Sequence, residues 1–355
     1  MFDAQRLRNF AFSIFQKIGC PKKEANLAAK VLISADLRGI DSHGIARLSG
    51  YIRLWELERI NATPNIKVTH ETPSTATLDG DAGLGLVVAP EAMSMAIKKA
   101  SKVGTGWVAV KNSNHFGIAG YHAMMALEKD MIGFAFTNAS PLVAPTFSTE
   151  RMLGTNPIAV AIPTEKQPPF VADMATTTAA NGKLEVLMRK KQPAPEGWLQ
   201  DASGKPSTDS FGVKNGGSLL PLGGDREHGS HKGYALGAIV DILSGVLSGA
   251  NFGPWVPPFV AYSAPSDNPV GEGLGHFFGA MRIDAFRPAS DFKFQMDNWI
   301  DRFRNAKTAE IKNKVLIPGD PEREMEELRN KEGIPLIQPV IDDLEKLGAK
   351  FSVPL

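Results

Sequence analysis

The chain has 355 residues, of which 43% are hydrophobic, and its 39 lysines and arginines nearly balance 38 acidic residues. This globular composition is long enough for one large or two ordinary domains, and it contains no basic block for binding nucleic acid. No apolar run approaches the roughly 20 residues of a membrane span, and the first helical stretch lacks the apolar core of a secretory signal. Because Cys20 is the single cysteine, no disulfide can form within the chain, and we expect a cytosolic protein.

The N-terminal part of the chain predicts helices. Residues 1–60 show apolar positions at helical spacing, interrupted at "GCPKK" and "RGIDSHG". From about residue 66 the pattern changes to short β-rich runs. The stretch "APEAMSMAIKKASKVG" then predicts an amphipathic helix, with Pro90 in its first turn and Gly104 at its end.

Strands and helices alternate loosely in the rest of the chain, around a Pro/Gly-rich stretch at 192–229. The predicted strands are contained in "GWVAVKNSNHFG", "MIGFAFTNAS", "PIAVAIPT", "PFVADMA", "GHFFGAMRIDAFRP" and "VLIP". The predicted helices are contained in "GYHAMMALEKD", "KGYALGAIVDILSGVLSGA", "DFKFQMDNWIDRFRNAK" and residues 321–332. This order favours an α/β fold with a mixed sheet over a strict βαβ series.

A glycine-rich turn in "TATLDGDAGLGLVVAPEA" has some features of a Rossmann dinucleotide-binding loop. Gly83 and Gly85 lie between a predicted strand and a helix, but Val88 stands where the third glycine is needed for close packing. Lys111, rather than an acidic residue for a ribose hydroxyl, ends the next strand. A tight turn is therefore the better interpretation.

The segment "GIDSHGIAR" has two interpretations. In the structural one, Gly39 ends a helix, Asp41 or Ser42 caps the next helix, and Arg47 lies on its outer face. In the functional one, His43 carries protons and Arg47, one helical turn later, binds a carboxylate on the same face. The choice between these interpretations depends on whether other residues of the chain can form a site with His43.

A second histidine, His115, follows a predicted strand in "NSNHFG". Loops at strand ends often hold catalytic groups in α/β proteins, although a histidine bonded within a polar turn is equally consistent with the pattern. Lys232 lies at the N-terminal end of a predicted helix, where a cation is unfavourable unless it binds a ligand. Asp320 can be explained as a helix N-cap without any further function. No motif predicts a metal site. Further polar groups follow other strands: Ser140, Thr155, Asn156 and Asp173.

Six motifs, in chain order, together resemble the malate/L-lactate dehydrogenase family, which is unrelated to the Rossmann-type enzymes. They are "DSHGIARLSGY", "NSNHFGIAGY", "GTNPIAVAIP", "DMATTTAANGK", "HKGYALG" and "IPGDPE". The resemblance runs from about residue 5 to 335. It implies a mixed-sheet fold that binds NAD or NADP without the glycine fingerprint, and a homodimer whose subunits help to form each other's sites.

The resemblance also implies roles for individual residues. The catalytic residues would be His43, His115 and Ser42, while Arg47 and Asn114 would bind substrate. The cofactor contacts would be Ser140, Asn156, Asp173, Met174, Ala175, Lys232, Pro318, Gly319, Asp320 and Glu322. Two features depart from the family pattern: Asp320 stands where glutamate is more common, and "SGANFGPWVPPFVAYSAPSDNPVGEG" is irregular.

We therefore expect an NAD- or NADP-dependent 2-hydroxyacid dehydrogenase that acts on a small-molecule substrate, with malate and oxaloacetate as the first pair. Ureidoglycolate, L-lactate or L-sulfolactate oxidation and cyclic imino acid reduction stay open, as does a non-catalytic ligand-binding role. We expect residues 1–125, joined by 320–355, to form the helical region for substrate binding and dimerisation. Residues 126–319 would form the cofactor domain.

Overall fold

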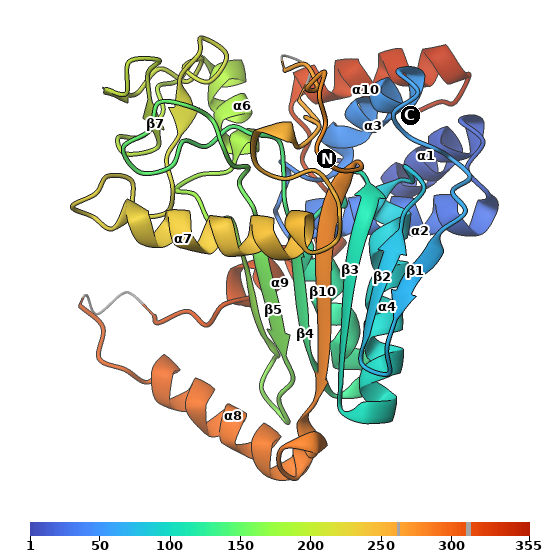
Figure 1. Ribbon diagram of the computed structural model, residues 1–355, viewed down its shortest axis with the longest axis vertical. Coiled ribbons are helices and arrows are strands. Elements are labelled where there is room, and N and C mark those ends of the chain that lie inside the picture. Colours follow the sequence, from blue (N-terminus) through green and yellow to red (C-terminus); the bar gives the residue numbers. More distant parts are fainter. Residues whose placement is uncertain (261–262, 310–313) are drawn as a thin grey trace.

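A computed structural model describes residues 1–260, 263–309 and 314–355 (Figure 1). The predicted N-terminal helices are confirmed. They pack around one apolar core together with the C-terminal helix α10, which the sequence analysis does not predict. Asp3 begins α1 by accepting the Arg6 N–H at 2.8 Å, as an N-cap does. The elements of this layer are α1 (Ala4–Lys17), α2 (Lys22–Leu37), η1 (Ile45–Arg47), α3 (Leu48–Glu56) and α10 (Gln338–Phe351).

A seven-stranded sheet in the order β1-β2-β3-β10-β4-β5-β6 forms the centre of the molecule. Only β2 and β3 pair in parallel among these neighbours, and the other pairs are antiparallel. The predicted mixed sheet of an α/β fold is therefore confirmed. Its strands are β1 (Lys67–Glu71), β2 (Thr75–Asp79), β3 (Thr105–Ser113), β4 (Met131–Thr137), β5 (Ile158–Ile162), β6 (Phe170–Met174) and β10 (Leu274–Arg282).

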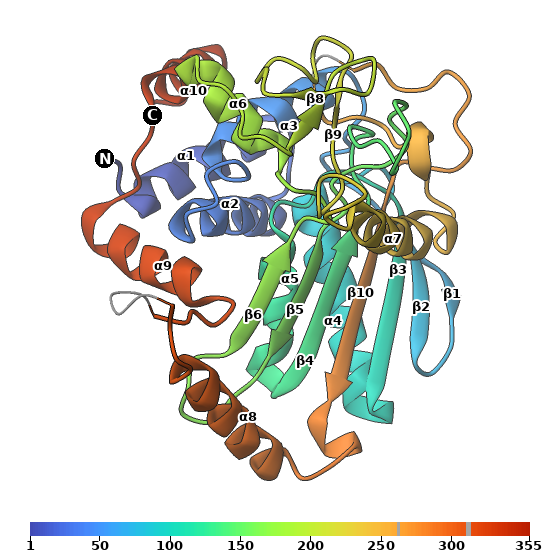
Figure 2. The same cartoon turned by 90° about the vertical axis from the view of Figure 1, so that its left-hand side faces the viewer.

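One face of the sheet is covered by α4 (Gly85–Val103), α5 (Ala119–Met124) and the 3-10 turn η2 (Met125–Lys129), as Figure 2 shows. Alanines on both the helices and the strands, together with larger apolar residues such as Val108, Val110 and Phe278, fill this second core. The prediction for Pro90 is wrong, because α4 begins five residues before it and Pro90 lies inside the helix. Gly104 ends α4 with φ of 94°, as predicted, since a glycine tolerates this left-handed conformation.

A smaller layer lies beyond one end of the central sheet. It contains a three-stranded sheet in the order β8-β7-β9 and the helix α6, which the sequence analysis does not predict. Helix α7 crosses this end of the molecule and continues into a π-helical turn, η3 (Figure 1). The bounds are α6 (Asn181–Lys190), β7 (Leu199–Gln200), β8 (Pro206–Ser207), β9 (Ser218–Leu219), α7 (Ser230–Asp241), η3 (Ile242–Val246) and η4 (Gly253–Trp255).

The C-terminal third returns to the N-terminal helices through η5 (Ile283–Ala285), α8 (Ala289–Arg304) and α9 (Asp320–Glu332). The strand predicted in "VLIP" is wrong: this segment is irregular, and Pro318 only accepts the Val171 N–H at the edge of β6. Asp320 is the first residue of α9 rather than its N-cap, which is Gly319. Within the described ranges, no helix is long and apolar enough to span a membrane.

Several strands carry polar residues beyond the same end of the sheet. The strand pairings place the carboxyl ends of β3, β4 and β6 beside the amino ends of β10 and β5. Loops that leave these strand ends therefore meet, which brings His115 after β3 and Ser140 after β4 to one place. The N-terminal helices close this end of the sheet from the side (Figure 2).

Candidate active site

The turn that carries His43 is anchored by a buried carboxylate. Asp36, in the last turn of α2, is 1% exposed and accepts the Ile45 N–H at 2.6 Å. Gly44 lies against the same carboxylate, since a Cβ atom there would come within 2.0 Å of it. Burial raises the pKa of Asp36 well above its usual range. Asp36 thus fixes the backbone at Gly44 and Ile45, directly after His43.

Helix α9 contacts the part of this turn that precedes His43. Arg329 forms an ion pair with Asp41 and also donates to the backbone oxygen of Asp36. The predicted capping role of Asp41 or Ser42 is wrong, because the next helical turn, η1, has Gly44 as its N-cap and no side-chain cap. The turn is therefore built by contacts between distant segments rather than by local capping.

His43 is half-buried, and its Nδ1 lies 2.9 Å from the hydroxyl of Ser42. Arg47 folds back toward this pair, and its Nε donates to the Ser42 carbonyl oxygen at 2.6 Å. The regular helical turn that the functional interpretation assumed between His43 and Arg47 is absent, since only Ile45–Arg47 of this segment is helical and it is a 3-10 turn. The two side chains nevertheless reach the same cavity. Desolvation and the nearby Arg47 charge lower the pKa of His43 to about 3.

His115 has a well-defined hydrogen-bonding partner. Its Nδ1 lies 2.6 Å from the hydroxyl of Tyr51 and also accepts the Gly117 N–H at 3.3 Å. A backbone N–H can only donate, so Nδ1 is the accepting nitrogen and Nε2 carries the proton of the neutral ring. Burial raises the pKa of Tyr51, which keeps it a neutral hydroxyl. Burial, followed by the charges of His43 and Arg47, lowers the pKa of His115 well below its usual value.

The two imidazoles are stacked, with ring centroids 5.4 Å apart. Phe259, from the irregular stretch before residue 261, packs on His115 with a centroid distance of 4.7 Å. The irregular stretch that departs from the family pattern thus forms one wall of the site. Residues 261 and 262 of that stretch lie outside the described residues. A cavity of about 60 Å³ lies here, lined by His43, Arg47, His115, Ala139, Ser140, Leu142, Thr155, Ala180, Asn181, Gly182, Phe259 and Val260.

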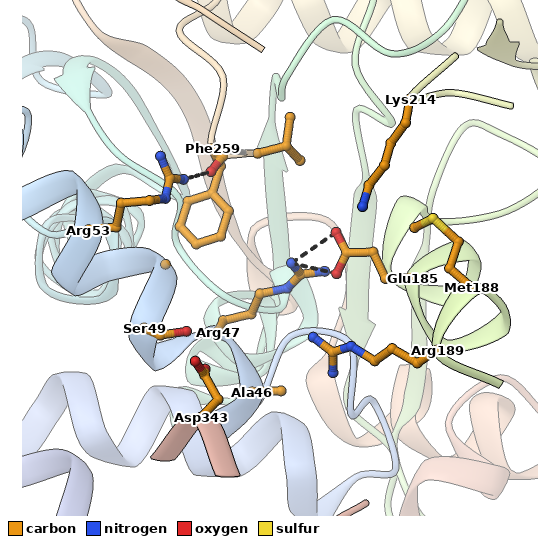
Figure 3. Close-up of a pocket in the computed structure, with 12 residues that line it drawn as sticks. Ala46, Arg47, Ser49, Arg53, Glu185, Met188, Arg189, Lys214, Phe259 and Asp343 are labelled. Atoms are coloured by element: carbon orange, nitrogen blue, oxygen red, sulfur yellow. Dashed lines mark hydrogen bonds and ion pairs between the residues drawn. The ribbon is translucent and has the colours of Figure 1, made fainter. Parts of the chain in front are cut away.

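Two larger pockets adjoin this histidine cavity. One of about 460 Å³ shares Arg47, Phe259 and Val260 with it (Figure 3). The other, of about 600 Å³, shares Gly182 with it, and Ser42 and Glu322 lie in its walls. We call them the Arg47 pocket and the Glu322 pocket. The histidines therefore lie between two spaces, one with several charged side chains and one with mainly apolar walls.

Arg47 is paired with a carboxylate that the sequence did not single out. Its terminal nitrogen NH1 lies 3.0 Å from Glu185 of helix α6, and both side chains point into the Arg47 pocket (Figure 3). Arg47 also lies over the ring of Phe259, 6.0 Å from its centroid. The structural interpretation of Arg47 as a solvated outer face is wrong, because its side chain is only 16% exposed.

Among the residues expected near the cofactor, Ser140 lies in the histidine cavity, where its hydroxyl accepts the Phe259 N–H at 2.9 Å. Asn156 is fully buried and bridges two backbones, since it accepts the Ala139 N–H and donates to the Gly237 carbonyl oxygen. Asp173 accepts the Gly120 N–H at 2.8 Å, and burial raises its pKa to about 6. Met174 is exposed and Ala175 half-buried just beyond.

The other expected cofactor residues are more scattered. Lys232 is exposed in the first turn of α7 and lies outside the walls of the histidine cavity and its two neighbours. Asp320 forms ion pairs with Arg304 and Arg323, next to Pro318 and Gly319. Glu322 reaches the pocket named after it. Asn114, expected to bind substrate, instead donates from its amide nitrogen to the backbone oxygens of Arg59, Ala82 and Gly83.

Three residues of the site were missed from the sequence: Tyr51, Glu185 and Phe259. Tyr51 carried a signal, because it ends the motif "DSHGIARLSGY" eight residues after His43. Glu185 and Phe259 lie in segments whose position depends on tertiary packing. No group of three or more histidine, cysteine, aspartate or glutamate side chains suited to a metal occurs among the residues that the structure describes.

Comparison with known proteins identifies the family. A family model described as malate/L-lactate dehydrogenase matches residues 2–345. A malate dehydrogenase of Pyrococcus abyssi is 46% identical over 98% of this chain and 94% of its own length. An L-sulfolactate dehydrogenase of Methanocaldococcus jannaschii is 39% identical, over 96% and 94% of the two chains. The solved structure of malate dehydrogenase from Pyrococcus horikoshii superimposes with a TM-score of 0.90 at 40% identity, covering 99% and 95%. The resemblance seen in the six motifs is thus confirmed, and the chain belongs to the malate/L-lactate dehydrogenase family.

Proposed function

We propose that this protein is a nicotinamide-dependent 2-hydroxyacid dehydrogenase that interconverts malate and oxaloacetate. The observation that carries the proposal is the stacked pair of His43 and His115 beside Arg47 in one cavity. Oxidation of a 2-hydroxy acid needs a base for the hydroxyl proton and a cation for the carboxylate. The names of relatives at 43–46% identity support malate as the substrate.

Arg47 binds the substrate carboxylate in this proposal. A guanidinium can hold a carboxylate through parallel hydrogen bonds, which fixes the angle as well as the position of the acid. The Nε bond to Ser42 and the Phe259 ring hold Arg47 beside both histidines. A carboxylate bound there leaves the neighbouring C2 oxygen facing the imidazoles. Phe259 and the small volume of the cavity limit the room for water.

The histidines handle the proton of the C2 oxygen. Neutral His115 presents Nε2–H, which can donate a hydrogen bond to a keto oxygen, because Nδ1 is engaged by Tyr51 and Gly117. In the oxidation direction, the free nitrogen of a neutral imidazole takes the hydroxyl proton. In the reduction direction, one imidazole must first be protonated, and the negative charge of the bound acid favours this state. In this proposal His43 accepts the proton in the oxidation direction and His115 binds the C2 oxygen, because Nε2 of neutral His115 already carries a proton and its Nδ1 is bonded to Tyr51 and Gly117.

The Glu322 pocket fits a nicotinamide cofactor, NAD or NADP. Its walls are mainly apolar, as a flat aromatic ring requires, and the carboxylates of Asp41 and Glu322 can accept hydrogen bonds from ribose hydroxyls. Gly182 separates this pocket from the histidines, and a Cβ atom there would lie 2.3 Å from Ser42 Cβ. The missing side chain therefore keeps the passage open. When bound, the cofactor takes or returns the C2 hydrogen with its electron pair.

We further propose a homodimer in the cytosol, with the division at residue 125 into a substrate region and a cofactor domain. The apolar residues of the N-terminal helices are buried within their own chain, so they do not support dimerisation. Exposed apolar side chains on α7 and η3 do: Ile239, Ile242, Val246 and Leu247 are all more than half exposed. The single buried Cys20 supports a reducing compartment.

A spectrophotometric screen tests the proposal. NADH and NADPH would each be combined with oxaloacetate, pyruvate, sulfopyruvate, 2-oxoglutarate and cyclic imino acids. Oxidation of one nicotinamide with oxaloacetate as the best substrate is the expected result. Preference for another 2-oxo acid would replace malate while keeping the class of enzyme. Activity with imino acids alone, or with none of these compounds, would contradict the proposal.

A further inference from the structure

Glu185 forms an ion pair with Arg47, the residue that we propose as the ligand of the substrate carboxylate. Its carboxylate lies 3.0 Å from Arg47 NH1, inside the pocket that adjoins the histidines (Figure 3). Glu185 is held there by a second contact, because the Asn181 amide nitrogen donates to it at 2.9 Å. A substrate acid and a glutamate side chain present the same chemical group to Arg47. The protein thus contains its own carboxylate ligand for the residue that binds substrate.

The contact with Glu185 uses only part of the hydrogen-bonding capacity of Arg47. Nε is engaged by the Ser42 carbonyl, and both oxygens of Glu185 approach the same nitrogen, NH1, at 3.3 and 3.0 Å. The contact is therefore not the parallel two-nitrogen arrangement that binds carboxylates most strongly. A small acid, free of a helix backbone, can adopt the better arrangement. Two carboxylates on one guanidinium repel each other, which favours exchange of the acid with Glu185 over binding beside it.

Glu185 has other cations within its own pocket. Arg189 is four residues later on α6 and therefore on the same face of the helix, and Lys214 lies across the pocket (Figure 3). In the walls of the Arg47 pocket, four cationic side chains accompany two carboxylates, Glu185 and Asp343. A Glu185 side chain released from Arg47 would therefore remain in a pocket whose walls carry more cationic than acidic side chains. The exchange therefore costs little electrostatic energy.

We propose that Glu185 is an internal competitor of the substrate, which occupies Arg47 in the empty enzyme and leaves when a 2-oxo acid binds. This inference rests on the proposed role of Arg47 as the carboxylate ligand. It makes Glu185 a determinant of KM rather than of the chemical step. The opposite role is a permanent partner that orients Arg47 for the substrate. The two roles predict changes of opposite sign when the carboxylate is removed.

The test compares Glu185→Gln with Asp343→Asn. Both remove one negative charge from the wall of the same pocket, but only Glu185 contacts Arg47. Calorimetric titration with oxalate, an unreactive dicarboxylate, should give a Kd about fivefold lower for Glu185→Gln, the order expected for losing a partly exposed ion pair. The KM for oxaloacetate should fall by a similar factor. Asp343→Asn measures the general electrostatic effect, which should be smaller.

Glu185→Ala should change both constants in the same direction, since it removes any remaining hydrogen bond to Arg47. Unchanged or weaker oxalate binding in the two Glu185 variants would overturn the proposal and assign Glu185 the orienting role. The oxalate titration does not depend on turnover. Should the wild-type protein oxidise no nicotinamide cofactor with any 2-oxo acid, the proposed function fails, while the titration still decides whether Glu185 competes for Arg47.

Discussion

Tyr51 and His115 form a partly buried hydrogen bond, with 2.6 Å between the phenol oxygen and Nδ1. This bond joins α3 to the loop after β3, two segments that the sequence places more than 60 residues apart. It fixes which nitrogen of His115 faces the cavity. It can also persist when the ring is protonated, because a phenol oxygen can accept a hydrogen bond as well as donate one.

Tyr51→Phe should therefore lower kcat by about tenfold to a hundredfold, because a small error in ring orientation costs this much in rate. The loss of stability should be about 1 kcal/mol, since the ring keeps its packing against Phe15 and Phe259. Steady-state kinetics and a thermal melt measure both effects. ¹⁵N NMR of His115 should still show the Nε2–H tautomer, because the Gly117 N–H continues to donate to Nδ1. Unaltered kcat would make Tyr51 a packing residue only.

The histidine substitutions test the proton transfer itself. His43→Ala and His115→Ala should each reduce kcat by about two to four orders of magnitude, which is the usual contribution of a general acid or base. Cofactor affinity, measured by fluorescence titration, should change little. His70→Ala is the matched control, because His70 is exposed on β1 and lies outside the walls of the histidine cavity. A larger effect on KM than on kcat would indicate an orienting role for that histidine.

The placement of both histidines could be anticipated from the sequence because it depends on local patterns. A strand followed by a polar loop predicts that His115 lies at a sheet end, and the break after an apolar helix exposes the turn of His43. The six ordered motifs supplied the family. By contrast, the packing that brings these two segments together involves α9, Asp36 and the loop of Phe259, and no spacing in the chain encodes those contacts.

Helix α6 carries residues of the site but is not predicted from the sequence. Its ten residues contain four charged and four apolar side chains, and the segment is too short for a clear helical pattern. It nevertheless places Glu185 beside Arg47 and Gly182 between the histidine cavity and the Glu322 pocket. The expected capping at Asp41 and Ser42 was wrong for a related reason. Asp41 pairs with Arg329, which is 288 residues away in the chain.

Dimerisation can be tested on the exposed apolar side of α7 and η3. The wild-type protein should sediment as a dimer at micromolar concentration, and Leu247→Asp should shift it toward the monomer, because Leu247 is 57% exposed and a buried charge there is costly. Val68→Asp is the control, since Val68 is 45% exposed on the edge strand β1. A wild-type monomer with full activity would contradict the proposed dimer.

The lowered histidine pKa values make a directional prediction about pH. Oxidation of the hydroxy acid releases one proton, so the ratio of kcat/KM for the two directions must change by about tenfold per pH unit. Since the pKa of His43 is about 3 and that of His115 is also lowered, both rings are neutral in the free enzyme near neutral pH. The oxidation direction needs a neutral ring, and its kcat/KM should stay level from about pH 6 to about pH 9.

The whole pH dependence should therefore appear in the reduction direction. With saturating NADH or NADPH, kcat/KM for oxaloacetate should fall about tenfold per pH unit over the same range, because the protonated ring becomes rarer. Measuring both directions in the same buffers separates the possibilities. A reduction profile that becomes level below about pH 7, with an oxidation profile that falls below the same pH, would mean that a histidine keeps its ordinary pKa in the site.

Arg47→Lys tests the carboxylate site with the charge preserved. Lysine cannot form parallel hydrogen bonds to a carboxylate, and it cannot reproduce the Nε bond to Ser42 while reaching the cavity. The substrate would be held at a less defined angle, and kcat/KM for oxaloacetate should fall on the order of a hundredfold. Cofactor affinity should hardly change, because Arg47 lines the histidine cavity and the Arg47 pocket but not the Glu322 pocket.

A thermal melt of Arg47→Lys should show a loss of only about 1 kcal/mol in the free energy of unfolding, for one hydrogen bond. Wild-type kcat/KM in this variant would remove Arg47 from substrate binding, and a large loss of stability with a normal KM would make it a structural residue that holds the Ser42 turn.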